Sequence, residues 1–369
     1  MKVKMIAPCL FGLEGIVADE LRRLHMDHVA AENGRVLFSG SEKDIPRANL
    51  NLRCAERVLI EMGRFPASDF DALFEGVKAL SWEEYIPKNG SFPVKGFSLD
   101  SKLRSIPGCQ KIIKRAIVER LKLKYGLNWF PEDGAVYQVQ FSIMKDQAVL
   151  SLDTSGAGLH KRGWRAQGVA APLRETLAAG MVHLSRYRGK EPFCDPFCGS
   201  GTIVIEAALA ALNRAPGLGR SFAAQSWDRI SSNLWTEAAQ EARAGEFQRE
   251  YDIWGGDLDP RAISIARSNA QKAGVSDLVR FERKDASDFA RLDSGGVIVT
   301  NPPYGERMLE LREAELLYQK FGAAYAKLDR WRLYLLSAHA MFESGFGKKA
   351  DKKRKLYNGM IKCDLFMYR

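Results

Sequence analysis

The octapeptide Asp195-Pro-Phe-Cys-Gly-Ser-Gly-Thr202 joins a short apolar strand, predicted from Phe193 to Pro196, to an apolar helix predicted from Thr202 to Leu212. Gly199 and Gly201 allow the backbone to turn tightly and to approach a ligand that side chains would keep away. The backbone amides that open the helix are free to bind a carboxylate or a phosphate. Alone, such a turn equally fits a dinucleotide site or a purely structural turn.

Strands and helices continue to alternate beyond this turn. The pattern predicts a strand over 251–256 followed by a helix over 260–273, and then strands over 279–283 and 297–300. Strands that alternate with crossover helices indicate a parallel, doubly wound sheet of the α/β class. The polar segment 213–250, which contains two tryptophans, interrupts the first two units as an insertion.

Acidic residues stand at the ends of the predicted strands. Asp257 ends one strand, where a carboxylate can accept hydrogen bonds from both hydroxyls of a ribose. Asp259 directly precedes Pro260 and is expected to cap the next helix. Asp285 ends the following strand, where it can accept from an adenine amino group, although a lone acid there is more often solvated. In series with the glycine turn at Asp195, Asp257 and Asp285 favour a nucleoside-containing cofactor.

The strand over 297–300 runs into Asn301-Pro302-Pro303-Tyr304-Gly305. Two prolines fix this corner, so it can hold acceptor groups at little entropic cost. The Asn301 side-chain oxygen and the Pro302 carbonyl can accept the two hydrogens of an exocyclic base amine, while Tyr304 stacks on the base. These acceptors stabilise the cationic transition state of methyl transfer, and the base must leave any paired stack. The alternative is a proline-rich turn with Tyr304 in the core.

The amino-terminal part also alternates strands and helices. It closes with a strand pair over 137–143 and 147–153, and an amphipathic helix is predicted over 110–125. Another helix is predicted from Pro172 to Leu184, after the pattern changes near residue 159. We therefore expect three units, over residues 1–50, 51–160 and 161–369.

The composition limits the classes of function. The 369 residues carry a formal net charge of +10, which suits an anionic partner or simply a basic soluble protein. No apolar run is long enough to span a bilayer, so no membrane association is expected. The six cysteines and five histidines show no metal-ligand spacing, so no metal is expected, and free thiols suit a reducing cytoplasm.

Taken together, these motifs resemble the THUMP-domain class I RNA methyltransferases, and within them the bacterial 23S rRNA guanine-N2 methyltransferases. The resemblance also covers four further segments: Val94–Ile117, Gly158–Arg165, Ala171–Ala178 and Lys355–Gly359. It implies an α/β fold with a Rossmann-like class I methyltransferase domain preceded by a ferredoxin-like segment and a THUMP domain. Some relatives carry a second fused methyltransferase, which we expect to be absent from a chain ending at Arg369.

The resemblance implies S-adenosylmethionine as cofactor and RNA, most plausibly ribosomal RNA, as partner. The expected catalytic residues are Asn301, Pro302, Pro303 and Tyr304. The expected cofactor-binding residues are Asp195, Pro196, Phe197, Gly199, Gly201, Asp257, Leu258, Asp285 and Ala286. The expected activity is methylation of guanosine N2 in 23S rRNA. Alternatives, in order, are a tRNA guanine-N2 methyltransferase, an adenine-N6 DNA methyltransferase and a non-catalytic RNA-binding assembly factor. The oligomeric state is left open.

Two basic segments are candidates for RNA phosphate binding, with solvated charge as the alternative. The expected contacts in the first are Lys95, Lys102, Lys111, Lys114, Arg115 and Lys122. Those in the second are Lys352, Lys353, Arg354 and Lys355, within a tail expected to be either a mobile basic loop over the pocket or a flexible charged loop of no specific role.

Overall fold

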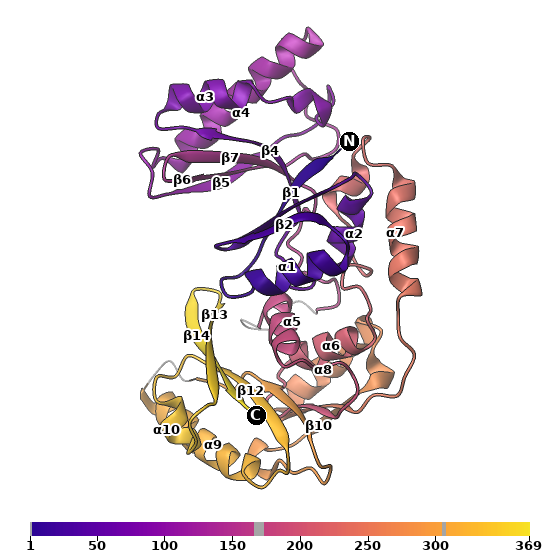
Figure 1. Ribbon diagram of the computed structural model, residues 1–369, viewed down its shortest axis with the longest axis vertical. Helices are drawn as coiled ribbons and strands as arrows, with labels where there is room; N and C mark the ends of the chain where they lie inside the picture. The colour runs from indigo at the N-terminus through magenta and orange to yellow at the C-terminus, as the bar shows by residue number, and fades with distance from the viewer. Residues whose placement is uncertain (1, 166–172, 305–307) are drawn as a thin grey trace.

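The computed structural model describes residues 2–165, 173–304 and 308–369. Two mixed seven-stranded sheets organise two lobes, one above the other in Figure 1. The predicted helix start at Pro172, together with Ala171 and Gly305, falls outside the described residues. Over the described residues, no helix combines the length and apolar character needed to cross a bilayer.

The N-terminal lobe consists of the first sheet and its helices. Across the sheet, the strands are β2 Asp27–Glu32, β3 Arg35–Gly40, β1 Val3–Pro8, β4 Leu59–Pro66, β7 Gln147–Asp153, β6 Val139–Met144 and β5 Val94–Leu99. The helices are α1 Glu14–Arg23, α2 Asp44–Asn51, α3 Phe70–Lys78, the 3₁₀ turn η1 Trp82–Glu84 and α4 Ile106–Tyr125. Because β1 pairs with β4, one continuous sheet crosses the expected boundary near residue 50.

The long helix α4 starts earlier than the sequence predicts. Its first residue is Ile106 rather than Gln110, because the Ser105 side chain accepts a hydrogen bond from the Gly108 amide at 3.1 Å. A proline in the first turn costs no hydrogen bond there. Gly126, with a φ of +66°, ends the helix in the left-handed conformation. The cap therefore sets the start of the helix, and the glycine sets its end.

The C-terminal lobe consists of the second sheet and the helices α5, α6 and α8 to α10. Across the sheet, the strands are β10 Val279–Arg283, β9 Ile253–Asp257, β8 Phe193–Asp195, β11 Gly296–Thr300, β12 Trp331–Ser337, β14 Ile361–Tyr368 and β13 Lys352–Asn358. The helices are α5 Glu175–Leu184, α6 Thr202–Ala211, α8 Pro260–Lys272, α9 Met308–Tyr325 and α10 Phe342–Phe346, with 3₁₀ turns η3 Ser276–Leu278 and η4 Ala286–Asp288. The first five strands are parallel, which confirms the predicted doubly wound arrangement.

The insertion over 213–250 joins the two lobes. Its elements are the 3₁₀ turn η2 Ala223–Ser226 and helix α7 Ser232–Ala244, which lies beside α2 (Figure 1). The Arg47 guanidinium pairs with Glu241 of α7 at 3.0 Å, and Trp227 stacks on Tyr137 with ring centroids 4.7 Å apart. The insertion thus connects the two lobes by packing against the N-terminal lobe.

The basic tail is not the mobile or flexible loop that the sequence analysis expects. Residues 352–358 form β13, paired in antiparallel register with β14, and Gly359 turns the chain with a φ of +63°. The hairpin reaches the N-terminal lobe, where the Arg354 Nε donates to the Gly12 carbonyl at 3.1 Å. The buried Leu356 shows why the segment is ordered: one of its faces packs into the protein although most of its residues are charged.

Candidate functional site

The glycine turn and the double-proline corner lie at the same edge of the second sheet. Strand β8 lies between β9 and β11, and all three run parallel, so their carboxyl ends meet. The Thr300 hydroxyl, one residue before Asn301, donates to Asp195 Oδ1 at 2.6 Å. The Gly199 amide donates to Asp257 Oδ2 at 2.9 Å. Two hydrogen bonds thus tie together the three strand ends from which the predicted site residues come.

The structure gives a different reason for glycine at each of the two glycine positions of the turn. Gly201 has a φ of +83°, and a Cβ there would lie 3.0 Å from both Ala266 and Phe281, so a side chain would separate packed elements. Gly199 has a φ of +51°, and its missing side chain would point into open space. Among the described residues no side chain caps α6, so its first amides remain available to a ligand. The turn therefore has an open face where Gly199 lies.

Asp195 is the most unusual carboxylate at this edge. The residue is 1% exposed, and its Oδ1 accepts from Thr300 and from the Phe197 amide. Its Oδ2 has no hydrogen-bond partner among the residues that the structure describes. Burial raises the pKa of Asp195 to about 7, against the opposing effect of its two hydrogen bonds. A buried acceptor of this kind fits a cationic or hydrogen-bond-donating group of a ligand, such as an ammonium.

The other two acids are held by backbone amides. Asp257 Oδ1 accepts from the Asp259 amide at 2.9 Å, and Asp259 caps α8 through the Arg261 amide at 2.8 Å, as predicted. Asp285 caps η4 through the Ser287 amide, a hydrogen bond that lowers the pKa of this carboxyl. Each carboxylate oxygen has a second lone pair, so Asp257 and Asp285 can still accept from a ligand.

Apolar residues surround these acids. Leu258, the residue after β9, is 60% exposed, whereas Ala286 and Pro196 are buried. The half-buried Phe197 meets Phe321 edge to face, with ring centroids 5.2 Å apart. The edge therefore offers buried and half-exposed apolar surface next to carboxylates, a combination that fits a nucleoside-containing ligand.

Side-chain hydrogen bonds, as well as the two prolines, hold the double-proline corner in place. The Tyr304 hydroxyl donates to Asn301 Oδ1 at 2.8 Å, and the Asn358 amide of β13 donates to the Tyr304 hydroxyl at 3.2 Å. The Tyr318 hydroxyl donates to the Pro303 carbonyl at 2.7 Å. Burial raises the pKa of Tyr304 to about 12, so the phenol stays protonated and keeps its donor.

This geometry gives Tyr304 a role beyond the expected stacking on a base. The ring is half-buried against the main hydrophobic core, and its hydroxyl orients Asn301. Sequence reasoning missed Asn358 and Tyr318 as partners of the corner. Asn358 does lie in the family-like segment 355–359, which was a usable signal, whereas Tyr318 lies in an ordinary helical pattern.

The predicted RNA contacts divide into exposed and engaged side chains. Lys114 is engaged within the protein, because its ammonium lies 3.4 Å from the Phe92 ring centroid and pairs with Glu132 at 2.6 Å. Hydrogen bonds or ion pairs also engage Lys122 with Glu119, Lys353 with Glu343 and Arg354 with Gly12. Lys353 is nevertheless exposed, and the exposed members of the set that form no ion pair with a described residue are Lys95, Lys102, Lys111, Arg115, Lys352 and Lys355.

Strand β5 adds an aromatic side chain to this surface. It is an edge strand, and its residues 95, 97 and 99 project from the same face because side chains alternate along a strand. Phe97 on that face is 52% exposed, next to the exposed Lys95. Exposed aromatic rings beside cations are typical of surfaces that bind single-stranded nucleic acid.

Comparison with known proteins agrees with this architecture. Three family models match the chain: the RlmL ferredoxin-like domain over residues 4–59, the THUMP domain over 67–153 and the RMKL-like methyltransferase domain over 162–366. The YpsC protein of Bacillus subtilis strain 168, named as an RNA methyltransferase, is 46% identical over 100% of this chain and 96% of its own length.

Two further relatives extend the comparison. The ribosomal RNA large subunit methyltransferase K/L of Syntrophotalea carbinolica is 35% identical over 99% of this chain, which spans about half (53%) of that protein. The crystal structure of the methyltransferase SMU.472, solved with S-adenosylhomocysteine, is 41% identical, has a TM-score of 0.95 and covers 100% of this chain and 98% of its own. The chain therefore belongs to the RMKL-like methyltransferase family and is an RlmL-like RNA methyltransferase that uses S-adenosylmethionine.

Proposed function

We propose that this protein methylates the exocyclic N2 of a guanosine in 23S ribosomal RNA, in the cytoplasm. The observation that carries the proposal is the Thr300–Asp195 hydrogen bond, which joins the double-proline corner to the glycine turn. The name of the K/L relative supports ribosomal RNA as the substrate. The six unpaired, buried cysteines are compatible with a reducing compartment.

The residues of the turn fit S-adenosylmethionine. When bound, the cofactor supplies an electrophilic methyl group on a sulfonium centre. In this proposal, the unpartnered Oδ2 of Asp195 binds the cofactor's ammonium group, and Asp257 accepts from the ribose hydroxyls. Asp285 accepts from the adenine amino group, while Leu258 and Ala286 contact the adenine ring. Pro196, Phe197, Gly199 and Gly201 shape the turn that faces the methionine moiety.

The corner binds the target amine. Asn301 Oδ1 has two lone pairs, so it accepts from Tyr304 with one and from the guanine amine with the other. The Pro302 carbonyl accepts the second hydrogen of the amine, and Pro303 keeps the corner rigid with the help of Tyr318. The amine nitrogen gains positive charge as it attacks, so these acceptors stabilise the transition state more than the ground state. Tyr304 acts as a positioning residue for Asn301.

The RNA is also bound by surfaces outside the site of methyl transfer. The exposed cations Lys95, Lys102, Lys111 and Arg115 provide phosphate contacts on the N-terminal lobe, and Phe97 stacks an unpaired base. Lys352 and Lys355 provide contacts on the β13–β14 hairpin, which touches both lobes. We assign the ferredoxin-like, THUMP and methyltransferase units to residues 1–50, 51–160 and 161–369.

Transfer of labelled methyl groups to unmodified 23S rRNA, transfer RNA and duplex DNA tests the substrate. Asn301→Ala is expected to abolish transfer and to leave RNA binding, measured by filter retention, within about twofold, because the side chain acts on the amine alone. Full activity of Asn301→Ala would refute its role. Methylation of transfer RNA alone would favour a tRNA guanine-N2 methyltransferase. Methylation of duplex DNA alone would favour an adenine-N6 DNA methyltransferase, and RNA binding without any methylation would favour an assembly factor.

A further inference from the structure

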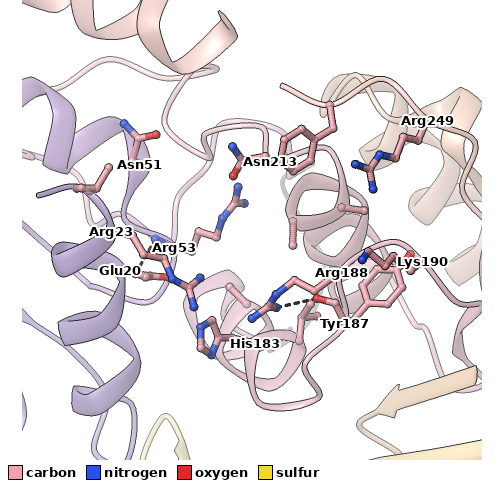
Figure 2. A pocket seen from close by; sticks show the side chains of 16 residues that line it. Glu20, Arg23, Asn51, Arg53, His183, Tyr187, Arg188, Lys190, Asn213 and Arg249 are labelled. Carbon is pink, nitrogen blue, oxygen red and sulfur yellow. Dashed lines mark hydrogen bonds between the residues drawn. The ribbon is translucent and has the colours of Figure 1, made fainter. Parts of the chain in front are cut away.

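A cavity of about 510 Å³ lies between the two lobes, away from the candidate site. It is bounded by α1 on the N-terminal lobe and by α5 and the end of α6 on the C-terminal lobe (Figure 2). Lys190 lines it just before β8 begins, and Asn213 lines it just after α6 ends. The cavity therefore lies at the amino edge of the second sheet, opposite the edge that carries the glycine turn and the proline corner. Its size is typical of small-molecule sites.

Four exposed cations form the rim of this cavity. Arg23 comes from the last turn of α1, and the others, which follow α5 or α7 in the chain, are Arg188, Lys190 and Arg249. Figure 2 shows Arg23 and Arg188 pointing into the same space from opposite lobes. None of the four forms an ion pair with any residue that the structure describes.

The acids near the rim do not neutralise it. Asp19 pairs with Arg22 at 2.8 Å, and Glu191 pairs with Arg332 at 2.6 Å. Glu20 lies on the floor, and burial raises the pKa of its carboxyl. The cavity thus has a positive rim whose charge its own side chains leave uncompensated, and a multiply charged anion complements it.

The floor carries buried polar atoms without partners. Four residues that line the cavity each have a buried side-chain atom that makes no hydrogen bond among the described residues: Glu20 Oε1, Arg53 Nη1, His183 Nε2 and Tyr187 Oη. Burial, with Arg188 and Arg23 nearby, lowers the pKa of His183 to about 4, so the ring is neutral at pH 7. Buried polar groups normally have partners, so these four residues have hydrogen-bonding capacity that the protein itself leaves unused.

An exposed aromatic ring completes the lining. Phe247 is 48% exposed, and the Arg249 guanidinium lies 5.4 Å from its ring centroid. A ring paired with an arginine offers a stacking surface for a nucleobase. The cationic rim therefore matches the phosphates of a nucleotide, and the polar floor matches its polar edges. The Phe247 ring matches the base.

We propose that this cavity binds a nucleotide carrying two or more phosphate charges, either as a free nucleoside diphosphate or as the phosphorylated end of an RNA chain. Such a ligand contacts α1 from one lobe and Arg188 from the other, so its binding also fastens the lobes together. The proposal is independent of the methylation chemistry, since it concerns the opposite edge of the sheet.

Calorimetric titration tests the site. The full chain is saturated with S-adenosylhomocysteine, which occupies the cofactor site, and is titrated with GDP and with short RNAs carrying a 5′-phosphate or a 5′-hydroxyl. The test variant is Arg23→Gln with Lys190→Gln. The matched control is Lys327→Gln with Arg330→Gln, which removes the same charge from exposed positions outside the cavity. Thermal unfolding by circular dichroism confirms that both variants fold.

We expect one equivalent of GDP, or of the 5′-phosphorylated RNA, to bind. Affinity should fall about tenfold or more in the test variant and change less than about twofold in the control, because only the first loses charge-assisted contacts. GDP binding would identify a free nucleotide as the ligand, and binding of the 5′-phosphorylated RNA alone would identify an RNA end. Failure of both to bind, or equal losses in both variants, would overturn the proposal. Because methyl transfer is not the readout, this result is separate from that of the function proposed above.

Discussion

The pKa of Asp195 predicts that cofactor binding depends on pH. Burial raises this pKa to about 7, and an ammonium bound at Oδ2 favours the ionised carboxylate. In the free protein, Asp195 stabilises the fold at acidic pH, and this contribution is lost as pH rises through about 7. Affinity for S-adenosylhomocysteine should show the opposite trend. It should weaken by about tenfold at one pH unit below the pKa and reach a plateau above pH ~8.

Thr300→Val tests the origin of this dependence. Valine fills nearly the same space but removes the donor that lies 2.6 Å from Asp195 Oδ1. That hydrogen bond lowers the pKa of Asp195, so its loss should move the midpoint of the pH profile upward. A buried hydrogen bond to a charged group contributes about 1.5–3 kcal/mol, so the midpoint should rise by about one unit or more.

Calorimetric titration with S-adenosylhomocysteine between pH 5.5 and 9 measures the profile. Asp195→Asn should bind weakly at every pH and lose the midpoint near 7. Thr236→Val, which alters an exposed threonine of α7, is the control and should keep the wild-type profile. An affinity independent of pH in the wild-type protein, or the same midpoint in Thr300→Val, would refute the assigned role of Asp195.

The remaining predictions concern the corner and the basic surface. Asn358→Ala removes the donor to Tyr304, so it should lower kcat about tenfold while leaving KM for the cofactor nearly unchanged; an equal rise in KM would point to a general structural defect. Neutralising Lys111 and Arg115 should reduce the salt slope of RNA binding by about 1.4, the value for two lost contacts to single-stranded RNA. Lys114→Met should instead lower the thermal unfolding midpoint and leave that slope unchanged, because Lys114 pairs with Glu132. A reduced salt slope in this variant would show that Lys114 contacts RNA.

The sequence predicts well those features that depend on neighbours in the chain. The glycine turn, the cap at Asp259 and the parallel strands follow from local patterns, and the structure confirms each of them. The meeting of Asn301 with the turn could also be predicted, because the carboxyl ends of parallel strands share one edge of a sheet.

Contacts between residues far apart in the sequence could not be predicted from local sequence patterns. The hydrogen bond from Asn358 to Tyr304 joins residues 54 positions apart, and β12, β13 and β14 carry no motif that reveals their pairing. Lys114 looked like one more surface cation because Glu132 and Phe92, which enclose it, lie elsewhere in the sequence. Each of these features depends on which distant segment packs against the residue, and residue spacing does not encode that.

Mass spectrometry of digested nucleosides tests the central claim most directly. Unmodified 23S rRNA is incubated with the protein and S-adenosylmethionine, and the methylated nucleoside is identified and mapped. If the double-proline corner and the glycine turn act as one site on guanine, the wild-type protein should form N2-methylguanosine at a defined position. The Asn301→Ala variant should form none. N6-methyladenosine, or N2-methylguanosine still formed by Asn301→Ala, would contradict the account.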